Sequence, residues 1–166
     1  DPDVIMIGEI RDDETARIAV RASITGHLVL STIHTNNSLN TIERLLDMEV
    51  ERYLLSTALT GIVSQRLARR LCPTCRKLRP TTPYEKKVFK EILNKDVENI
   101  LDVEGNCENC RNGYSGRIAI QEVLLINQQI RDAISSNARK NKLRDLVYTN
   151  EVDSLLQDGL SKVENG

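Results

Sequence analysis

The sequence predicts an α/β fold with a parallel sheet in its N-terminal part, and three observations indicate it. Apolar runs of strand length alternate with segments whose apolar residues recur at helical spacing. The first run, Val4 to Ile7, has no polar alternation, which is typical of a parallel strand covered on both faces. The chain has 166 residues, of which 40% are apolar, and this is enough to bury a core.

The segment after the first strand predicts a helix and then a second strand. Asp12 and Asp13 are candidates to cap the helix, which is expected to end near Gly26. Residues 27–34 (HLVLSTIH) are rich in β-branched and leucine residues and lead into a polar run, so a second strand is expected there.

Two further helices are expected between this strand and the first cysteine. Ile42, Leu45 and Leu46 fall on one helical face. Residues 51–65 predict a longer helix because their apolar residues fall four apart in two adjacent rows, although Gly61 weakens this prediction.

The remaining chain predicts a hairpin that carries an insert, followed by short helices. Residues 66–71 and 117–126 are expected to pair as strands, with a helix over 84–93 between them. Three short amphipathic helices should follow, centred on Ile130, Leu143 and Leu155. The expected domains are residues 1–71 for the α/β core, 72–116 for the insert and 117–166 for a strand with a C-terminal helical subdomain.

Composition excludes several classes of function. Lys and Arg number 23 against 24 Asp and Glu, so a net charge of −1 gives no general attraction to nucleic acid or anionic membrane. No apolar stretch approaches the ~20 residues needed to cross a bilayer, and no secretory signal pattern is present. The chain begins at Asp1 without an initiator Met, and we expect it to be a fragment of a longer protein.

All four cysteines lie in two C-x-x-C pairs, Cys72/Cys75 and Cys107/Cys110, separated by 31 residues. Each pair can direct two thiolates at one ion, and two pairs complete a tetrahedral shell, so we predict a structural Zn²⁺ site. Two disulfides and a thioredoxin-like redox pair are the alternatives. The insert is expected to have no core of its own and to depend on the metal for its fold.

Glu9 and His34 each follow a predicted parallel strand, and ligands of α/β sheets bind at this edge. A carboxylate there can orient an attacking water or hold Mg²⁺ at a phosphate site. The alternatives for Glu9 are a helix cap or a salt bridge to Arg11 or Arg21, and the alternative for His34 is a turn histidine whose hydrogen bonds are satisfied nearby.

Several segments resemble one known family. The run VIMIGEIRD, residues 4–12, resembles the atypical Walker B segment of the secretion and pilus-assembly ATPases, a branch of the RecA-like P-loop NTPases. STIHTN, residues 31–36, resembles their His box. GIVSQRLARRLCPTC and GYSGRIAIQEVL extend the resemblance over most of the chain, and the paired cysteines are typical of the type II secretion and type IV pilus extension members.

This resemblance implies a partial RecA-like core and assigns roles to residues. Glu9 would activate water or coordinate Mg²⁺, His34 would sense phosphate, and Thr32 and Thr35 would support the nucleotide site. It further implies an ATPase that uses ATP and Mg²⁺ and forms a homohexamer. Its partners would be an inner-membrane platform protein and other secretion or pilus components, and it would lie in the cytoplasm, peripheral to the inner membrane.

The chain departs from the family pattern in two respects: it lacks the aspartate-rich segment that the family places before its Walker B strand, and it lacks the phosphate-binding loop. No G-x-x-x-x-G-K-[ST] sequence occurs, and none of the eight Gly residues is followed by Lys. We therefore expect this chain alone to be inactive, since the phosphate-binding loop would lie upstream. A non-catalytic zinc-binding interaction module is the alternative function, and a zinc ribbon for nucleic acid is a weaker one.

A basic stretch follows the core, from Arg66 to Arg79. It contains six cations within fourteen residues. These side chains either form a solvated face or contact an anionic group, such as a neighbouring subunit's nucleotide or an acidic part of a membrane partner. Nucleic acid is not expected because the charge is otherwise balanced and aromatic residues make up only 3% of the chain.

Overall fold

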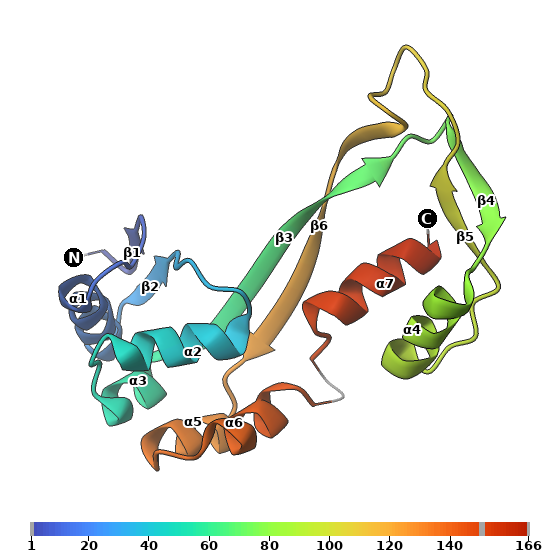
Figure 1. Cartoon of the computed structure of the whole chain (residues 1–166). Coiled ribbons are helices and arrows are strands. Elements are labelled where there is room, and N and C mark those ends of the chain that lie inside the picture. The colour runs from blue at the N-terminus through green and yellow to red at the C-terminus, as the bar shows by residue number, and fades with distance from the viewer. Residues whose placement is uncertain (1, 150–151, 166) are drawn as a thin grey trace. The chain divides into compact units, whose positions relative to one another are not determined.

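A computed structural model of the chain describes residues 2–149 and 152–165. The protein is mixed α/β (Figure 1), and it divides into two compact units, Asp1–Ser64 with Val123–Val152, and Gln65–Glu122 with Asp153–Gly166. The first unit contains β1 (Val4–Ile7), α1 (Asp13–Ile24), β2 (Leu28–Ser31), α2 (Ser38–Asp47), α3 (Arg52–Ala58), α5 (Gln128–Ser135) and α6 (Lys140–Val147). The second contains β4 (Arg76–Pro80), α4 (Pro83–Leu93), β5 (Asn99–Val103) and α7 (Leu155–Asn165), while β3 (Gly61–Leu71) and β6 (Tyr114–Leu125) belong partly to each.

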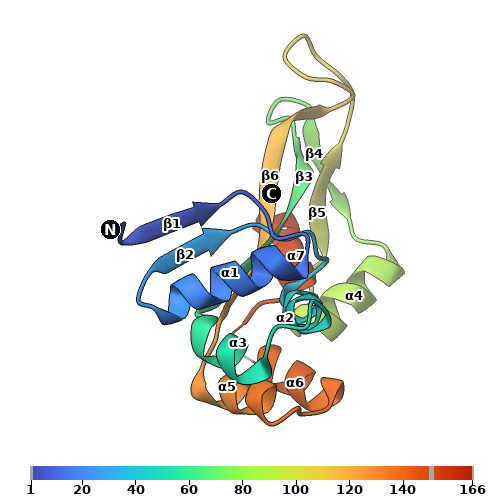
Figure 2. The same cartoon turned by 90° about the vertical axis from the view of Figure 1, so that its left-hand side faces the viewer.

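The predicted strand–helix–strand order at the N-terminal end is confirmed. β1 and β2 pair in parallel, with Val4 opposite Leu28, and Figure 2 shows α1 running alongside them. The expectation that β1 is covered on both faces is wrong for this chain. Val4 and Met6 are 52% and 65% exposed, because α1 covers the pair on one side only and the other face has no cover among the described residues.

The start of α1 follows the predicted capping pattern. The Asp12 side chain accepts a hydrogen bond of 2.8 Å from the Thr15 N–H, which satisfies a free donor of the first turn and lowers the pKa of the Asp12 carboxyl. The face that carries Ala16, Ala19 and Val20 is buried. The sequence spacing of Ile18, Ala19 and Ala22 predicted this face only in part, because Ile18 is 57% exposed.

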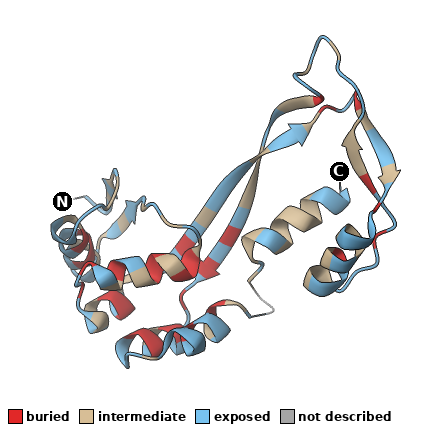
Figure 3. Cartoon of the chain, viewed as in Figure 1, coloured by how far each residue is buried: buried red, intermediate tan, exposed pale blue. Residues whose placement is uncertain are grey.

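Helices supply most of the core of the first unit, as the red segments of α2 and α5 in Figure 3 show. α2 begins at the Asn37 cap and buries the predicted face around Ile42, while the short helices α5 and α6 confirm the predictions centred on Ile130 and Leu143. Each fully buried aliphatic side chain stabilises the folded state by about 1.5–3 kcal/mol. The least exposed of them are Ile42, Leu55, Leu124, Ile130, Ile134 and Val147.

The predicted helix over 51–65 is wrong in its second half. α3 ends at Ala58 and β3 begins at Gly61, where exposure alternates between buried Ile62 and exposed Val63. β6 pairs with β3, and pairing between distant segments overrode the local helical spacing. Gly61 marks a close approach of the two strands, since a Cβ there would lie 3.3 Å from the Leu124 carbonyl oxygen.

The predicted pairing of the strands on either side of the insert is confirmed, because β3 and β6 are neighbours in one sheet. The Ile126 N–H donates to the Thr60 carbonyl, and the Cys72 N–H donates to the Gly113 carbonyl. These bonds join opposite ends of the two strands, so the strands run antiparallel.

The second unit contains an antiparallel pair, β4 and β5, that sequence analysis missed. Four of the five β4 residues are charged or proline, which hides any strand pattern. The predicted helix is confirmed as α4, which starts at a Thr82–Glu85 capping box. The expectation that the insert has no core is wrong, because Phe89, Val97 and Ile100 form a small buried cluster.

Across the described ranges, 2–149 and 152–165, we find no helix with the length and apolar character that spanning a membrane would require.

Candidate functional site

The loops that follow β1 and β2 bring Glu9 and His34 together. The Ile10 N–H donates to the Thr32 carbonyl at 2.8 Å, and the Thr32 hydroxyl donates to the Gly8 carbonyl at 2.7 Å. These two bonds join the strand ends beyond the sheet ladder. Glu9 Oε2 lies 3.4 Å from His34 Nε2, so the two predicted site residues meet at the carboxyl edge of the sheet.

The two carboxylate oxygens of Glu9 have different surroundings. Oε1 lies 2.5 Å from Arg11 Nη2, which is the salt bridge that sequence analysis offered as an alternative. Oε2 is buried and accepts no hydrogen bond from the described residues, and the contact with His34 lacks hydrogen-bond geometry. A buried acceptor without a donor is costly, so this oxygen fits a site for a water or a metal-bound water.

Arg11 also sets the charge of Glu9. Its hydrogen bond, opposed by partial burial, lowers the pKa of the Glu9 carboxyl, and the charges of Arg11 and His34 add to this effect. The carboxylate is therefore ionised at neutral pH. An ionised carboxylate with one unused oxygen can orient a water molecule or accept its proton.

The two predicted support residues lie differently with respect to Glu9. Thr32 is bonded to the carbonyl of Gly8, next to Glu9 in the chain. The Thr35 hydroxyl lies 2.7 Å from the Thr41 hydroxyl in the first turn of α2. Thr35 thus holds the loop after β2 against α2, whereas Thr32 holds the two strand ends together.

A second candidate site is formed by Cys72, Cys75, Cys107 and Cys110, whose sulfur atoms all lie within 4.8 Å of one another. Neighbouring Sγ–Sγ distances are 3.8 Å for Cys72–Cys107, 3.7 Å for Cys75–Cys110 and 3.6 Å for Cys107–Cys110. A tetrahedron with metal–sulfur bonds of about 2.3 Å has edges of about 3.8 Å. The spacing fits Zn²⁺, and all four cysteines are free rather than disulfide-bonded.

The electrostatics of the cluster also fit a cation. Burial of Cys72 opposes its ionisation, but backbone N–H groups of Thr74 and Cys75 outweigh this and lower its pKa to about 7. Hydrogen bonding to Cys107, together with burial, raises the pKa of Cys75 to about 12. Four adjacent thiols cannot all ionise without a compensating charge, and a divalent metal would supply it.

The backbone around the cysteines connects the two C-x-x-C turns to the strands. The Cys72 N–H donates to the Gly113 carbonyl, and the Glu104 N–H donates to the Cys75 carbonyl, both at 2.8 Å. Asn106 Oδ1 lies 3.2 Å from Cys110 Sγ. Sequence analysis missed the contact with Asn106, since a lone Asn in a loop has no distinctive spacing.

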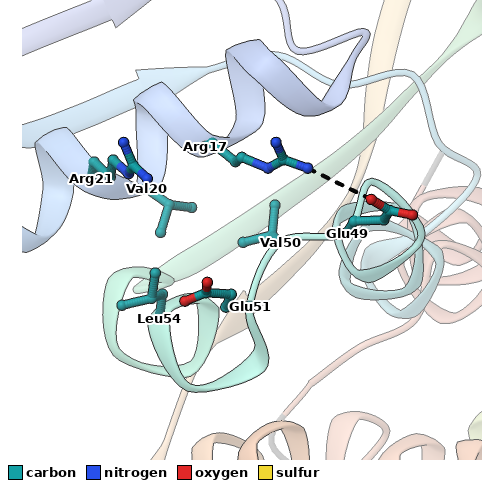
Figure 4. Close-up of a pocket in the computed structure, with 7 residues that line it drawn as sticks. All are labelled: Arg17, Val20, Arg21, Glu49, Val50, Glu51 and Leu54. Atoms are coloured by element: carbon teal, nitrogen blue, oxygen red, sulfur yellow. Dashed lines mark ion pairs between the residues drawn. The ribbon is translucent and has the colours of Figure 1, made fainter.

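A cavity of about 220 Å³ lies elsewhere in the first unit, between α1 and the start of α3 (Figure 4). Arg17 and Glu49 form an ion pair of 3.6 Å at one side of it. Two arginines face two glutamates, so the cavity has no net charge to favour a phosphate group. Its lining residues are Arg17, Val20, Arg21, Glu49, Val50, Glu51 and Leu54.

Comparison with known proteins gives a consistent result. The family model described as "Type II/IV secretion system protein" matches residues 1–166. The chain is 44% identical over 167 residues to "Type II secretion system protein E" of Aeromonas hydrophila, covering all of this chain and 33% of that protein. It is 40% identical over 174 residues to "Type IV pilus assembly ATPase PilB" of Thermus thermophilus, covering all of this chain and 19% of that protein.

Among solved structures, the chain resembles the Legionella pneumophila ATPase DotB. The TM-score is 0.64 at 22% identity, with 99% of this chain and 36% of DotB covered. At this identity the likeness concerns the fold alone. The chain spans about a third of the length of the type II secretion relatives that it matches.

Proposed function

The chain belongs to the type II/IV secretion system protein family, and we propose that it is part of an ATPase that powers type II secretion or type IV pilus assembly. The observation that carries this proposal is the position of Glu9. Its carboxylate lies beside His34 at the edge where parallel strands end, with one buried oxygen that accepts no hydrogen bond from the described residues.

In this proposal the chain's own residues prepare a water molecule for attack. Glu9 Oε2 orients the water and accepts its proton, while Arg11 holds Oε1 and keeps the carboxylate ionised. His34, whose side chain is 88% exposed, is free to reach a phosphate oxygen from the next strand end. ATP with Mg²⁺ would supply the phosphoanhydride bond and the neutralising charge.

The phosphate-binding half of such a site is not encoded in these 166 residues, since no glycine is followed by lysine. We therefore propose that a longer parent protein carries this loop upstream, and that the isolated chain does not hydrolyse ATP. Thr32 and Thr35 would support the nucleotide site by fixing the loop after β2. The first unit would then be part of a RecA-like core.

We propose that the four cysteines hold a structural Zn²⁺. Their sulfur spacing supports four-coordinate binding with no open position for a reacting ligand. The metal would join the turn at Cys72–Cys75 to the turn at Cys107–Cys110. It would stabilise the insert, residues 72–116, without taking part in hydrolysis.

The assembly is also part of the proposal. The parent protein would form a homohexamer in the cytoplasm, peripheral to the inner membrane, and pass motion to a polytopic platform protein of the secretion or pilus machinery. The family membership of the chain supports this arrangement.

The test is replacement of Glu9 by Gln in the parent protein. Removing the general base should lower kcat for ATP hydrolysis by about 10²- to 10⁴-fold, with little change in nucleotide affinity. Glu14→Gln, on the exposed first turn of α1, is the control and should retain the parental rate. Steady-state phosphate release and nucleotide binding are the measurements.

Two results would contradict the proposal: an unchanged kcat in Glu9→Gln, or Glu9-dependent turnover by the isolated chain. A parent protein without a phosphate-binding loop would instead favour a non-catalytic zinc-binding interaction module, in which the strands only support the cysteine cluster.

A further inference from the structure

One face of the β3–β6 ribbon in the second unit carries two arginines from opposite strands. Gln121 Nε2 donates to Gln65 Oε1 at 3.4 Å, which places these two side chains on the same face. Side chains alternate along a strand, so residues an even number of positions away share that face. Arg69 in β3 and Arg117 in β6 each lie four residues from this glutamine pair and therefore face the same way.

These two arginines lie on one face of the ribbon without a compensating acid among the described residues. They come from the two paired strands, and both residues are exposed. Neither forms an ion pair with any residue that the structure describes. Two unpaired cations on one face of a strand pair gain no attraction from each other, so this arrangement does not help the ribbon to fold.

Cations on β4, which pairs with β5 in a separate sheet, behave differently. Arg79 in β4 contacts both Glu85 and Asp102, and Lys77 contacts Glu104. The second unit therefore pairs these cations internally and leaves the ribbon arginines available. Arg69 is also held in position, because its guanidinium carbon lies 3.9 Å from the centre of the Tyr114 ring.

We propose that this face, defined by Arg69 and Arg117, binds an acidic, extended segment of a partner protein. Guanidinium groups bind carboxylates through two parallel hydrogen bonds, and a guanidinium stacked on a ring loses little further freedom on binding. Leu67 on the same face is 55% exposed and offers an apolar contact beside the charges. Figure 3 shows both strands of the ribbon largely exposed or half-buried.

The charge and shape of the surface favour a protein segment over a membrane or a nucleic acid. Membrane recognition by charge uses clusters of about four to eight basic residues. This face presents two on a ribbon that is two strands wide, in a chain of net charge −1. Nucleic-acid surfaces add stacking aromatics, but the chain contains only one Phe, four Tyr and no Trp. The binding proposed here is independent of ATP hydrolysis.

The experiment uses the zinc-loaded chain and a fluorescein-labelled dodecapeptide of alternating Glu and Thr, with a Gln/Thr peptide for comparison. Fluorescence anisotropy at low salt should show binding of the acidic peptide only. Arg69→Gln with Arg117→Gln should raise the dissociation constant about tenfold. The matched control, Lys142→Gln with Arg144→Gln on exposed positions of α6, should change it less than twofold.

Backbone amide shifts locate the binding. The acidic peptide should move the resonances of residues 66–70 and 114–119. The proposal is overturned if the shifts lie elsewhere, if both double variants weaken binding equally, or if phosphatidylglycerol-containing vesicles or a DNA duplex bind more tightly than the peptide. It is also overturned if Arg117→Gln lowers the thermal midpoint, since that would make the arginine a structural residue.

Discussion

Gly113 follows the second cysteine pair with a φ of +77°, a conformation that costs any other residue free energy. A Cβ at this position would lie 2.1 Å from Val103 Cγ1, so the side chain of β5 fills the space that glycine leaves. The carbonyl of Gly113 accepts the Cys72 N–H at 2.8 Å. Gly113 thus packs against β5 and bonds to the turn that contains Cys72 and Cys75.

Gly113→Ala should therefore destabilise the second unit by more than the about 1–2 kcal/mol expected for the backbone conformation alone. Gly105→Ala is the matched control, because Gly105 also has a positive φ, of +96°, but has no atom near its Cβ position. Denaturant unfolding of the zinc-loaded chains measures both variants. Adding Val103→Ala to Gly113→Ala should restore part of the lost stability, whereas adding it to Gly105→Ala should not. Equal losses of stability in the two glycine variants would contradict the steric argument.

Glu85 shows a second effect at the level of single residues. Two hydrogen bonds from Arg79, at 2.7 and 2.9 Å, and one from the Thr82 N–H lower its pKa to about 2. A lowered carboxyl pKa stabilises the fold above the unfolded value near 4.5, and this stabilisation disappears as the pH falls through about 2.

We predict that Glu85→Gln lowers the stability of the second unit at pH 7, and that the difference from the parent narrows as the pH falls from 4.5 toward 2. Acid releases the metal from the parent and from the variant alike. Comparing their stabilities at each pH therefore removes the contribution of metal release. Thermal unfolding monitored at several pH values is the measurement. A difference that stays constant with pH would exclude the charged pair as its source.

At the scale of elements, α3 is a short helix whose end is capped from another element. Its last carbonyls have no partners inside the helix. Arg131 in α5 donates from Nη1 to the Ser56 carbonyl at 2.5 Å and to the Thr57 carbonyl at 3.1 Å. The positive charge also suits the negative end of the helix dipole. The guanidinium therefore fixes α3 against α5.

Arg131→Ala should reduce the stability of the first unit by about 1–2 kcal/mol, because it leaves these carbonyls without a charged donor. Lys142→Ala, on the exposed surface of α6, should change it by less than about 0.5 kcal/mol. Urea unfolding followed by circular dichroism compares the two. If the two variants unfold at the same urea concentration, the cap contributes nothing to stability.

At the scale of the whole molecule, the chain forms two units with separate cores. The first is built around the helices, and the second around Phe89, Val97 and Ile100 and the cysteine cluster. A metal held by Cys72, Cys75, Cys107 and Cys110 would therefore stabilise one unit and not the other.

Chelation should release about one Zn²⁺ per chain and loosen residues 67–116. Hydrogen exchange should rise most in the two cysteine turns and less in α4, which retains the contact of Phe89 with Ile100. The first unit should keep its protection. A metal-free chain with unchanged exchange in the cysteine turns would show that the site is not a structural metal site.

Local patterns in the sequence were enough to predict several features of the fold. Apolar runs and the capping residue Asp12 predicted β1, α1 and the parallel order, and the two C-x-x-C pairs pointed to the four cysteines whose sulfur atoms the structure brings together. The sequence also placed Glu9 and His34 at strand ends, because a polar residue directly after an apolar strand lies at the sheet edge.

Other features depend on contacts between distant segments and could be seen only in the three-dimensional structure. Residues 61–65 form a strand because β6 pairs with them, although their spacing also fits a helix. β4 and β5 pair despite their charged and proline residues. Arg11 contacts one carboxylate oxygen of Glu9, and the other oxygen lies near His34. This arrangement of side chains also depends on the three-dimensional structure. Local periodicity specifies which face of an element is apolar, whereas strand pairing and hydrogen bonding depend on residues far apart in the chain.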